Sequence, residues 1–365
     1  MKMLFTVLLA AQILHAGNEV YFGPEFTFTN DAVVKAQRRN PVASDGAEWM
    51  NSPVSDGYVT QWKRAIAEQL RTNCPACRIV GEAEYGGAAR NIEFRVLYPD
   101  GWWYEVTTDP AAVEVKAKPA TSQQTASLAS RMQRDIFDLA RSISLMPHQY
   151  LGNGHVNISF TAFRQNPLLL RNFIVDYQNH PTLAIASLGN DPYNAPPIGL
   201  LSALARRTFA SVIRQFDGFG ARSNFDLSLW LVTNIQEQVY TEAWQPHESV
   251  PGNWRRKFQA VNMTTISPAI PEQSCRIEIR GHRPQRSANE WLLLVTLYDA
   301  KIKSLQRLRA PIALKSEQEL EVSVEIGARG RVRLTDRNPA RARQELQSYV
   351  EGAGLASDAY LQTFL

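Results

Sequence analysis

Alternation of polar and apolar residues marks five segments of the chain as strands. In the clearest, Arg276–Arg280, arginine and glutamate alternate with isoleucine. Side chains on a strand point alternately to the two faces of a sheet, so the charged residues face one way and the isoleucines the other. The same period occurs at 25–28, 92–96, 113–116 and 155–160. The pattern predicts one sheet with an apolar back and a polar front, although a solvated outer face would look similar.

Apolar residues recur at helical spacing over much of the remaining chain. The predicted helices lie at 58–72, 121–145, 165–178, 199–216, 287–307 and 339–351. Further strands are predicted at 78–84, 102–108, 319–326 and 331–335. The breaker-rich stretch 189–197 is long enough to be a loop that borders a site. With no repeat of fixed period and no clean linker, we expect one α+β domain, an antiparallel sheet with helices packed on its back.

The first residues have the features of an export signal. Lys2 precedes a short apolar run, and the small residues Ala16 and Gly17 follow it. This run is too short to cross a bilayer, so the pattern predicts a secretory signal peptide at 1–16 and a mature chain of 17–365. A buried first strand or helix is the alternative. No later run reaches about 18 apolar residues. We therefore expect an exported protein, periplasmic or secreted, whose mature chain has no membrane span.

Cysteine usage is thin. Cys74 and Cys77 have the CxxC spacing, but no second pair or nearby histidine completes a zinc site. In an exported chain a local disulfide is the simplest interpretation, and a redox-active dithiol is the alternative. Cys275 is then left over, and we expect it to be buried beside the Arg276–Arg280 strand.

Composition excludes several classes of protein. A content of 44% hydrophobic and 20% charged residues excludes wholesale disorder. The net charge of +4 is mild for 365 residues. Arginines crowd into 329–343 beside acidic residues and without aromatic residues, which is typical of a solvated hairpin and helix start, so we expect no nucleic-acid partner. No Walker loop, G-x-S-x-G elbow or HExxH stretch is present, and nothing marks a subunit interface.

The polar front of the predicted sheet carries three carboxylates and one imidazole, each on a different strand. They are Glu25, Glu114, His155 and Glu278. Hard cations such as Mg²⁺ and Mn²⁺ take oxygen ligands and, beside nucleotide phosphates, usually need only a few carboxylates. These residues are therefore candidate ligands for Mg²⁺ or Mn²⁺.

Two arginines flank Glu278 on the same strand face. Arg276 and Arg280 can hold a phosphate or a substrate carboxylate through paired hydrogen bonds, and their charge would stabilise a phosphoryl group during transfer. They are the candidate catalytic residues. The alternative is a cross-strand ladder of salt bridges on an exposed face.

Four motifs resemble the carboxylate–amine ligase superfamily, which includes glutamine synthetase, glutamate–cysteine ligase and the amidoligases. Gly23–Phe28 is similar to its opening Gly-x-Glu-x-Glu strand, and Asp109–Val115 to an Asp-Pro-x-x-x-Glu-Val segment of glutamate–cysteine ligase-like proteins. Gly154–Asn157 resembles a Gly-x-His-x-Asn or His-x-His strand, and Arg276–Arg280 an Arg-x-Glu-x-Arg strand. The motifs occur in the family's order.

The resemblance implies a fold, a reaction and residue roles. The fold is an antiparallel sheet curved into a funnel with helices outside. The reaction uses ATP to activate a carboxylate as an acyl phosphate, and an amine then displaces phosphate to form an amide. The substrates would be small-molecule or peptide carboxylates and amines.

The matching residues would take the family's roles. Glu25, Glu114 and Glu278 would bind the divalent metal, and His155 would contact the metal or a phosphate of ATP. Arg280 would neutralise the transferring phosphoryl group, and Arg276 would grip phosphate or the acceptor's carboxylate.

Two features depart from the family pattern. Thr27 stands where the family usually has a second carboxylate, and export would take the chain to a compartment that holds little ATP. They motivate a second hypothesis, in which the chain is an exported, non-catalytic member of the fold that binds an anionic amino-acid or peptide ligand.

Overall fold

The computed structural model describes most of the chain. The described residues are 19–32, 53–84, 92–109, 112–147, 154–183, 188, 198, 203–219, 226–240, 259–316, 324–326, 332–334 and 339–365. The predicted signal peptide at 1–16 and the predicted loop at 189–197 lie outside these residues. No described helix has the length and apolar character needed to span a membrane.

An eight-stranded sheet has the strand order β2-β3-β4-β5-β1-β6-β8-β7. The strands are β1 (Phe22–Phe28), β2 (Arg78–Glu84), β3 (Ile92–Leu97), β4 (Trp103–Asp109), β5 (Ala112–Ala117), β6 (His155–Ser159), β7 (Val261–Asn262) and β8 (Arg276–Ile279). The pairs β2–β3, β3–β4, β4–β5, β1–β5 and β7–β8 are antiparallel. All five segments recognised by alternation are strands of this sheet, so the predicted α+β class with an antiparallel sheet is confirmed.

The chain divides into two compact units. One contains Gly23–Val156 and His282–Val295, and is called the first unit below. The other, the second unit, contains the residues up to Phe22, Asn157–Gly281 and Thr296–Leu365.

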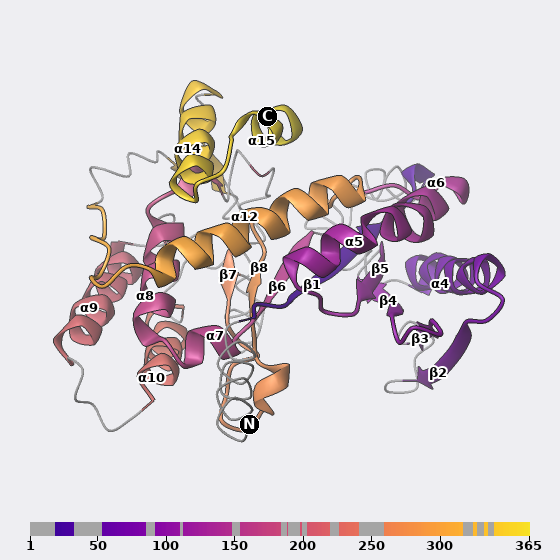
Figure 1. Cartoon of the computed structure of the whole chain (residues 1–365), viewed down its shortest axis with the longest axis horizontal. Helices are drawn as coiled ribbons and strands as arrows, with labels where there is room; N and C mark the ends of the chain where they lie inside the picture. The colour runs from indigo at the N-terminus through magenta and orange to yellow at the C-terminus, as the bar shows by residue number, and fades with distance from the viewer. Residues whose placement is uncertain are drawn as a thin grey trace, which may run out of the picture. The chain divides into compact units, whose positions relative to one another are not determined.

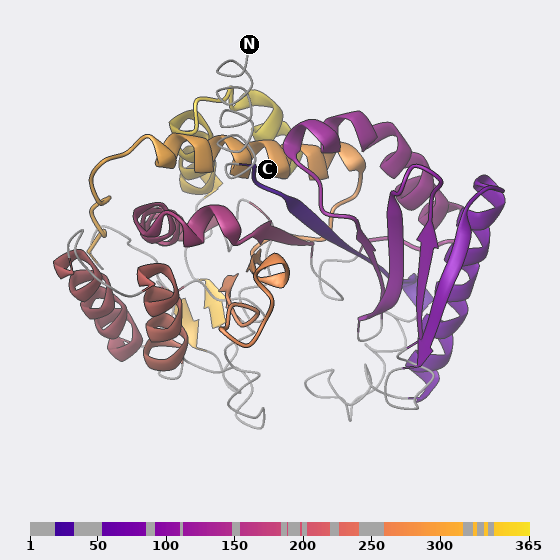
Figure 2. The same cartoon turned by 60° about the horizontal axis from the view of Figure 1, so that its bottom comes forward.

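In the first unit, helix α4 (Pro53–Asn73) packs on β3, β4 and β5 (Figures 1 and 2). The apolar back of β1 is covered by aromatic side chains. The Phe26 ring lies 5.0 Å from that of Phe137 and 5.7 Å from that of Trp291, both in edge-on contacts. Each such buried ring stabilises the fold by about 1.5–3 kcal/mol, and together they fix the β1 backbone that carries Glu25.

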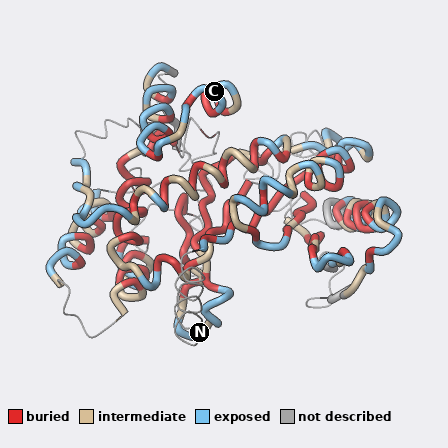
Figure 3. Tube along the Cα trace, in the orientation of Figure 1, coloured by how far each residue is buried: buried red, intermediate tan, exposed pale blue. Residues whose placement is uncertain are grey.

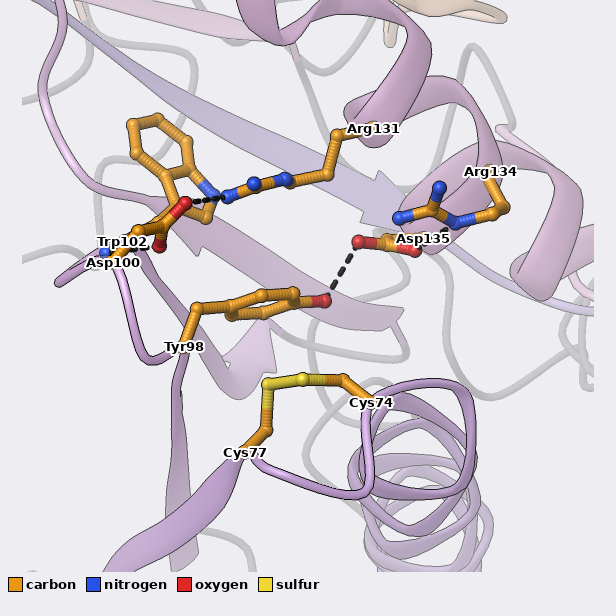
Figure 4. Close-up of a disulfide and its surroundings, with 8 residues drawn as sticks. All are labelled: Cys74, Cys77, Tyr98, Asp100, Trp102, Arg131, Arg134 and Asp135. Carbon is orange, nitrogen blue, oxygen red and sulfur yellow. Dashed lines mark hydrogen bonds and ion pairs between the residues drawn. A yellow bond between two sulfur atoms is a disulfide. The ribbon is translucent and has the colours of Figure 1, made fainter.

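The predicted helix at 121–145 is interrupted by a π-helical turn. Helix α5 (Ser122–Met132) is followed by the π turn Gln133–Asp138 and by α6 (Leu139–Ser142). The side chain of Gln133 accepts a 3.0 Å hydrogen bond from the backbone N–H of Ala288. Asp135 accepts a 2.6 Å hydrogen bond from the Tyr98 hydroxyl (Figure 4). The wider turn thus places both polar side chains against neighbouring elements, which a regular period does not anticipate.

The second unit is mainly helical. Its helices include α7 (Thr161–Arg164), α8 (Pro167–Gln178), α9 (Ala203–Gly218), α10 (Leu227–Asn234), α14 (Pro339–Gly352) and α15 (Asp358–Phe364). Helix α12 (Ala288–Gln306) begins in the first unit and ends in the second. Every residue of α8 from Leu169 to Gln178 is buried, as Figure 3 also shows. Strands β9 (Val324–Ile326) and β10 (Val332–Leu334) form a separate antiparallel hairpin.

Cys74 and Cys77 form a disulfide where α4 ends and β2 begins (Figure 4). Cys275 is free and buried, directly before β8. The structure therefore has the local disulfide and the leftover buried cysteine that the sequence predicted.

Candidate functional site

The first part of the candidate site is a hydrogen-bonded pair of side chains from β1 and β6. Glu25 lies at the centre of β1 and His155 begins β6. Both are buried, and Oε2 of Glu25 lies 2.7 Å from Nδ1 of His155. Burying a carboxylate is costly unless it gains a partner. If the Nδ1–H group donates the hydrogen bond to Glu25, the imidazole is neutral and Nε2 carries a lone pair, which is the atom that a metal would use.

The Glu25 position ends a row of alternating charges that crosses four strands. Arg95 on β3 pairs with Glu105 on β4, Glu105 with Lys116 on β5, and Lys116 with Glu25 on β1. Nε of Arg95 donates a 3.1 Å hydrogen bond to Glu105. One cross-strand salt bridge, between Arg95 and Glu105, is therefore present on this face, and the register continues the alternation of charge to the buried pair at Glu25 and His155.

Glu114 lies one step along the same face. It is opposite Thr27 of β1, and its Oε1 is 2.9 Å from Nζ of Lys116. Burial raises the pKa of Glu114, the negative charge of Glu25 raises it further, and Lys116 acts in the opposite sense. This carboxyl group thus already has a cationic partner within the chain.

Glu278 of β8 is held at both carboxylate oxygens. Nη1 of Arg280 donates a 2.6 Å hydrogen bond to Oε1, and Nδ2 of Asn262 on β7 donates a 2.7 Å hydrogen bond to Oε2. The backbone N–H of Thr264 in turn donates to Oδ1 of Asn262 at 2.9 Å, which fixes the amide. Asn262 was not predicted, because a two-residue strand has too few positions to show an alternation.

The two arginines of β8 have different surroundings. Arg280 is buried and bound to Glu278, whereas Arg276 is half-buried and donates a 2.8 Å hydrogen bond through Nε to Oδ1 of Asn157. This hydrogen bond restrains the plane of the Arg276 guanidinium, which is a planar fork of N–H donors. Such a fork suits a phosphate or carboxylate group.

Glu25, His155 and Glu278 each offer one ligand atom, and these atoms lie within 4.8 Å of one another. All three residues are buried. Two carboxylates and an imidazole supply the oxygen and nitrogen donors that Mn²⁺ or Mg²⁺ accepts, and a dication would offset the repulsion between the buried acids. The donor set therefore fits a divalent cation. Glu114, the fourth predicted ligand, is not part of this group among the described residues.

Comparisons with known proteins give one kind of match. A scan against protein-family models found no matching family, and a search of curated proteins found no matching protein. A comparison with solved structures matches 31 chains. One of them, "GmaS/ADP complex-Conformation 1", shares 11% sequence identity at a TM-score of 0.37, with 97% of this chain and 70% of that chain covered.

Proposed function

We propose that this chain is a divalent-metal- and ATP-dependent carboxylate–amine ligase that forms an amide through an acyl phosphate. The observation that supports this most strongly is the buried group of Glu25, His155 and Glu278. These residues come from three of the four motifs that resemble the ligase superfamily. Such a concentration of buried charge is unfavourable for stability alone, but it is suited to binding a cation.

In this proposal Glu25, His155 and Glu278 hold Mg²⁺ or Mn²⁺, which when bound supplies positive charge to the phosphate oxygens of ATP. Arg276 binds the γ-phosphoryl group or the substrate carboxylate through its terminal amino groups. Arg280 orients the Glu278 carboxylate, and adds positive charge where the phosphoryl group transfers.

The proposed reaction has two steps. A carboxylate oxygen of the substrate attacks the γ-phosphorus of ATP, the bond from that phosphorus to the bridging oxygen breaks, and ADP leaves. The amine then attacks the carbonyl carbon of the acyl phosphate, inorganic phosphate leaves, and the amine loses a proton. The products are one amide, ADP and phosphate for each ATP consumed.

Isothermal titration of the purified full chain with Mg²⁺–ATP tests the proposal. We expect saturable binding by the unaltered chain, and binding weakened at least about tenfold in Glu278→Gln, because an amide is a poorer metal ligand than a carboxylate. Glu272→Gln is the matched control. Glu272 is exposed and paired with Arg164 at 3.2 Å, so its loss should leave nucleotide binding unchanged. Absence of binding by folded protein at millimolar nucleotide would contradict the proposal.

One observation favours a second candidate function. Disulfides such as Cys74–Cys77 persist in oxidising compartments, which hold little ATP. If the chain is exported, as we also propose, it could bind an anionic amino acid or peptide without catalysis. Thermal denaturation with glutamate in the presence of EDTA distinguishes the two. Stabilisation by glutamate without metal or nucleotide supports the binding protein, whereas stabilisation that EDTA abolishes counts against it.

A further inference from the structure

Gly154 immediately precedes His155, and a side chain does not fit at its position. A Cβ placed there would overlap the side-chain amide of Gln285 and would lie 2.5 Å from the carbonyl oxygen of Arg283. The N–H of Gly154 donates a 3.3 Å hydrogen bond to the carbonyl oxygen of His282. Residues 282–285 of the first unit therefore approach closely the backbone that leads into β6 and carries His155.

Gln285 joins this segment to Gly154 through one buried amide. Gln285 is 1% exposed, and its Nε2 donates to two backbone carbonyl oxygens, that of Gly154 at 3.3 Å and that of Arg283 at 3.1 Å. Its Oε1 is also buried and accepts no hydrogen bond from the part of the chain that the structure describes. A buried acceptor without a partner costs stability, so this amide is not an optimal choice for packing alone.

Glu290 holds the segment that carries Gln285. Its carboxylate accepts hydrogen bonds from the Arg283 guanidinium at 2.7 and 3.1 Å, and another from the backbone N–H of Arg286 at 2.8 Å. The Arg283 and Glu290 side chains are only 11% and 10% exposed. A paired contact of this kind fixes geometry, and it restrains the chain on both sides of Gln285. The Gln285 amide is thus held in place against Gly154.

We propose that Gln285 is a positioning residue for His155, which acts through the backbone of Gly154. This inference rests on the proposed function and adds a residue that supports its metal site. Glu25 restrains the imidazole at Nδ1, 2.7 Å away, and Gln285 restrains the backbone from which the imidazole extends. Loss of a group that orients a metal ligand typically weakens metal binding by about 10–100-fold.

Manganese binding by Gln285→Met tests this inference. The full chain is titrated with Mn²⁺ alone, and the free ion is measured by electron paramagnetic resonance. Methionine has nearly the length of glutamine but cannot donate to the carbonyl oxygen of Gly154. We expect Mn²⁺ to bind about 10–100-fold more weakly to this variant. Gln178→Met is the matched control. Gln178 is a buried glutamine of α8 whose amide has no hydrogen-bond partner among the described residues, so Mn²⁺ affinity should stay unchanged.

Urea unfolding with and without Mn²⁺ gives a second readout. If Gln285 served packing alone, Gln285→Met would change stability, but the stabilisation that Mn²⁺ adds would stay the same. We expect that added stabilisation to fall, by about 1.4 kcal/mol for each tenfold loss of affinity. Unchanged Mn²⁺ affinity in natively folded Gln285→Met would overturn the inference. If that variant does not fold, Gln285→Asn, whose amide is one methylene shorter, decides in the same way. Absence of binding by the unaltered chain would contradict the proposed metal site, and this inference with it.

Discussion

Replacing Asn262 on β7 by alanine removes a side chain that orients the carboxylate of Glu278. The amide of Asn262 donates a 2.7 Å hydrogen bond to Oε2 of Glu278. The two residues are 2% and 4% exposed, so water cannot easily replace the lost donor. In Asn262→Ala the Glu278 carboxylate loses this hydrogen bond, and with it part of what fixes its orientation, while the 2.6 Å hydrogen bond from Arg280 remains.

The expected loss of stability follows from these contacts. A buried hydrogen bond to a charged group contributes about 1.5–3 kcal/mol. Thr264 also loses the acceptor for its backbone N–H at 2.9 Å and its hydroxyl at 2.8 Å. Thr264 is half-buried, so water can take that place and the added cost is about 0.5 kcal/mol. We therefore expect Asn262→Ala to lower the free energy of unfolding by about 2–3 kcal/mol.

Urea unfolding followed by circular dichroism, in the presence of EDTA, measures this change in the single variants Asn262→Ala and Glu278→Gln and in the double variant. The double-mutant cycle should give a coupling energy of about 1–2 kcal/mol. Asn234→Ala is the control, because the Asn234 side chain donates to the Trp230 carbonyl oxygen and accepts from Gln238, both four residues away along the same helical segment. A coupling below about 0.3 kcal/mol would refute the role assigned to Asn262. Without EDTA, Asn262→Ala should bind Mn²⁺ about 10–100-fold more weakly.

Three further variants and one chemical assay test other parts of the structure. Gly154→Ala would place a Cβ 2.5 Å from the carbonyl oxygen of Arg283, so the backbone must move, and we expect a loss of about 1–3 kcal/mol in urea unfolding. In Gly57→Ala the added Cβ on α4 has no heavy atom within 4 Å, so we expect the free energy of unfolding to rise by about 0.5–1 kcal/mol. Equal effects of the two substitutions would contradict the close approach at Gly154. Replacing the Cys74–Cys77 disulfide by serines should lower stability by about 2 kcal/mol, from the entropy of a short closed loop. Alkylation under denaturing conditions of protein isolated from its own cells should modify one thiol before reduction and all 3 cysteines after it. Its intact mass should show removal of Met1–Ala16. Three free thiols before reduction, or a retained Met1–Ala16, would contradict export.

The strands of the sheet were predictable because each carries apolar residues on one face that must be buried. The same reasoning fails for short or uniformly apolar elements. β7 has two residues, which cannot show a period. Helix α10 contains the run Leu229–Val232, four apolar residues in succession, which cannot be told from a buried strand by period alone. The π turn at Gln133–Asp138 was missed because it shifts the helical period locally.

The candidate site was predictable residue by residue but not in its pairing. Alternation placed Glu25, His155 and Glu278 on polar strand faces, and these residues lie together in the structure. The strand order, with β1 between β5 and β6, is not sequential, so the sequence could not say which polar residues are neighbours. Lys116 therefore looked like an ordinary charged residue of a strand, and only the register shows that it faces Glu25.

Burial differs between the two ends of the row of charges formed by Arg95, Glu105, Lys116 and Glu25. At its outer end the side chain of Arg95 is 47% exposed and that of Glu105 is 13% exposed, and an ion pair in such a position contributes at most about 1 kcal/mol. At its inner end Glu25 and His155 are only 10% and 8% exposed, where desolvation of a charged pair can exceed its Coulombic attraction. Apolar residues of similar size would stabilise the inner end better. The row therefore serves stability at Arg95 and Glu105, whereas stability alone does not account for the inner pair, as the proposed metal site requires.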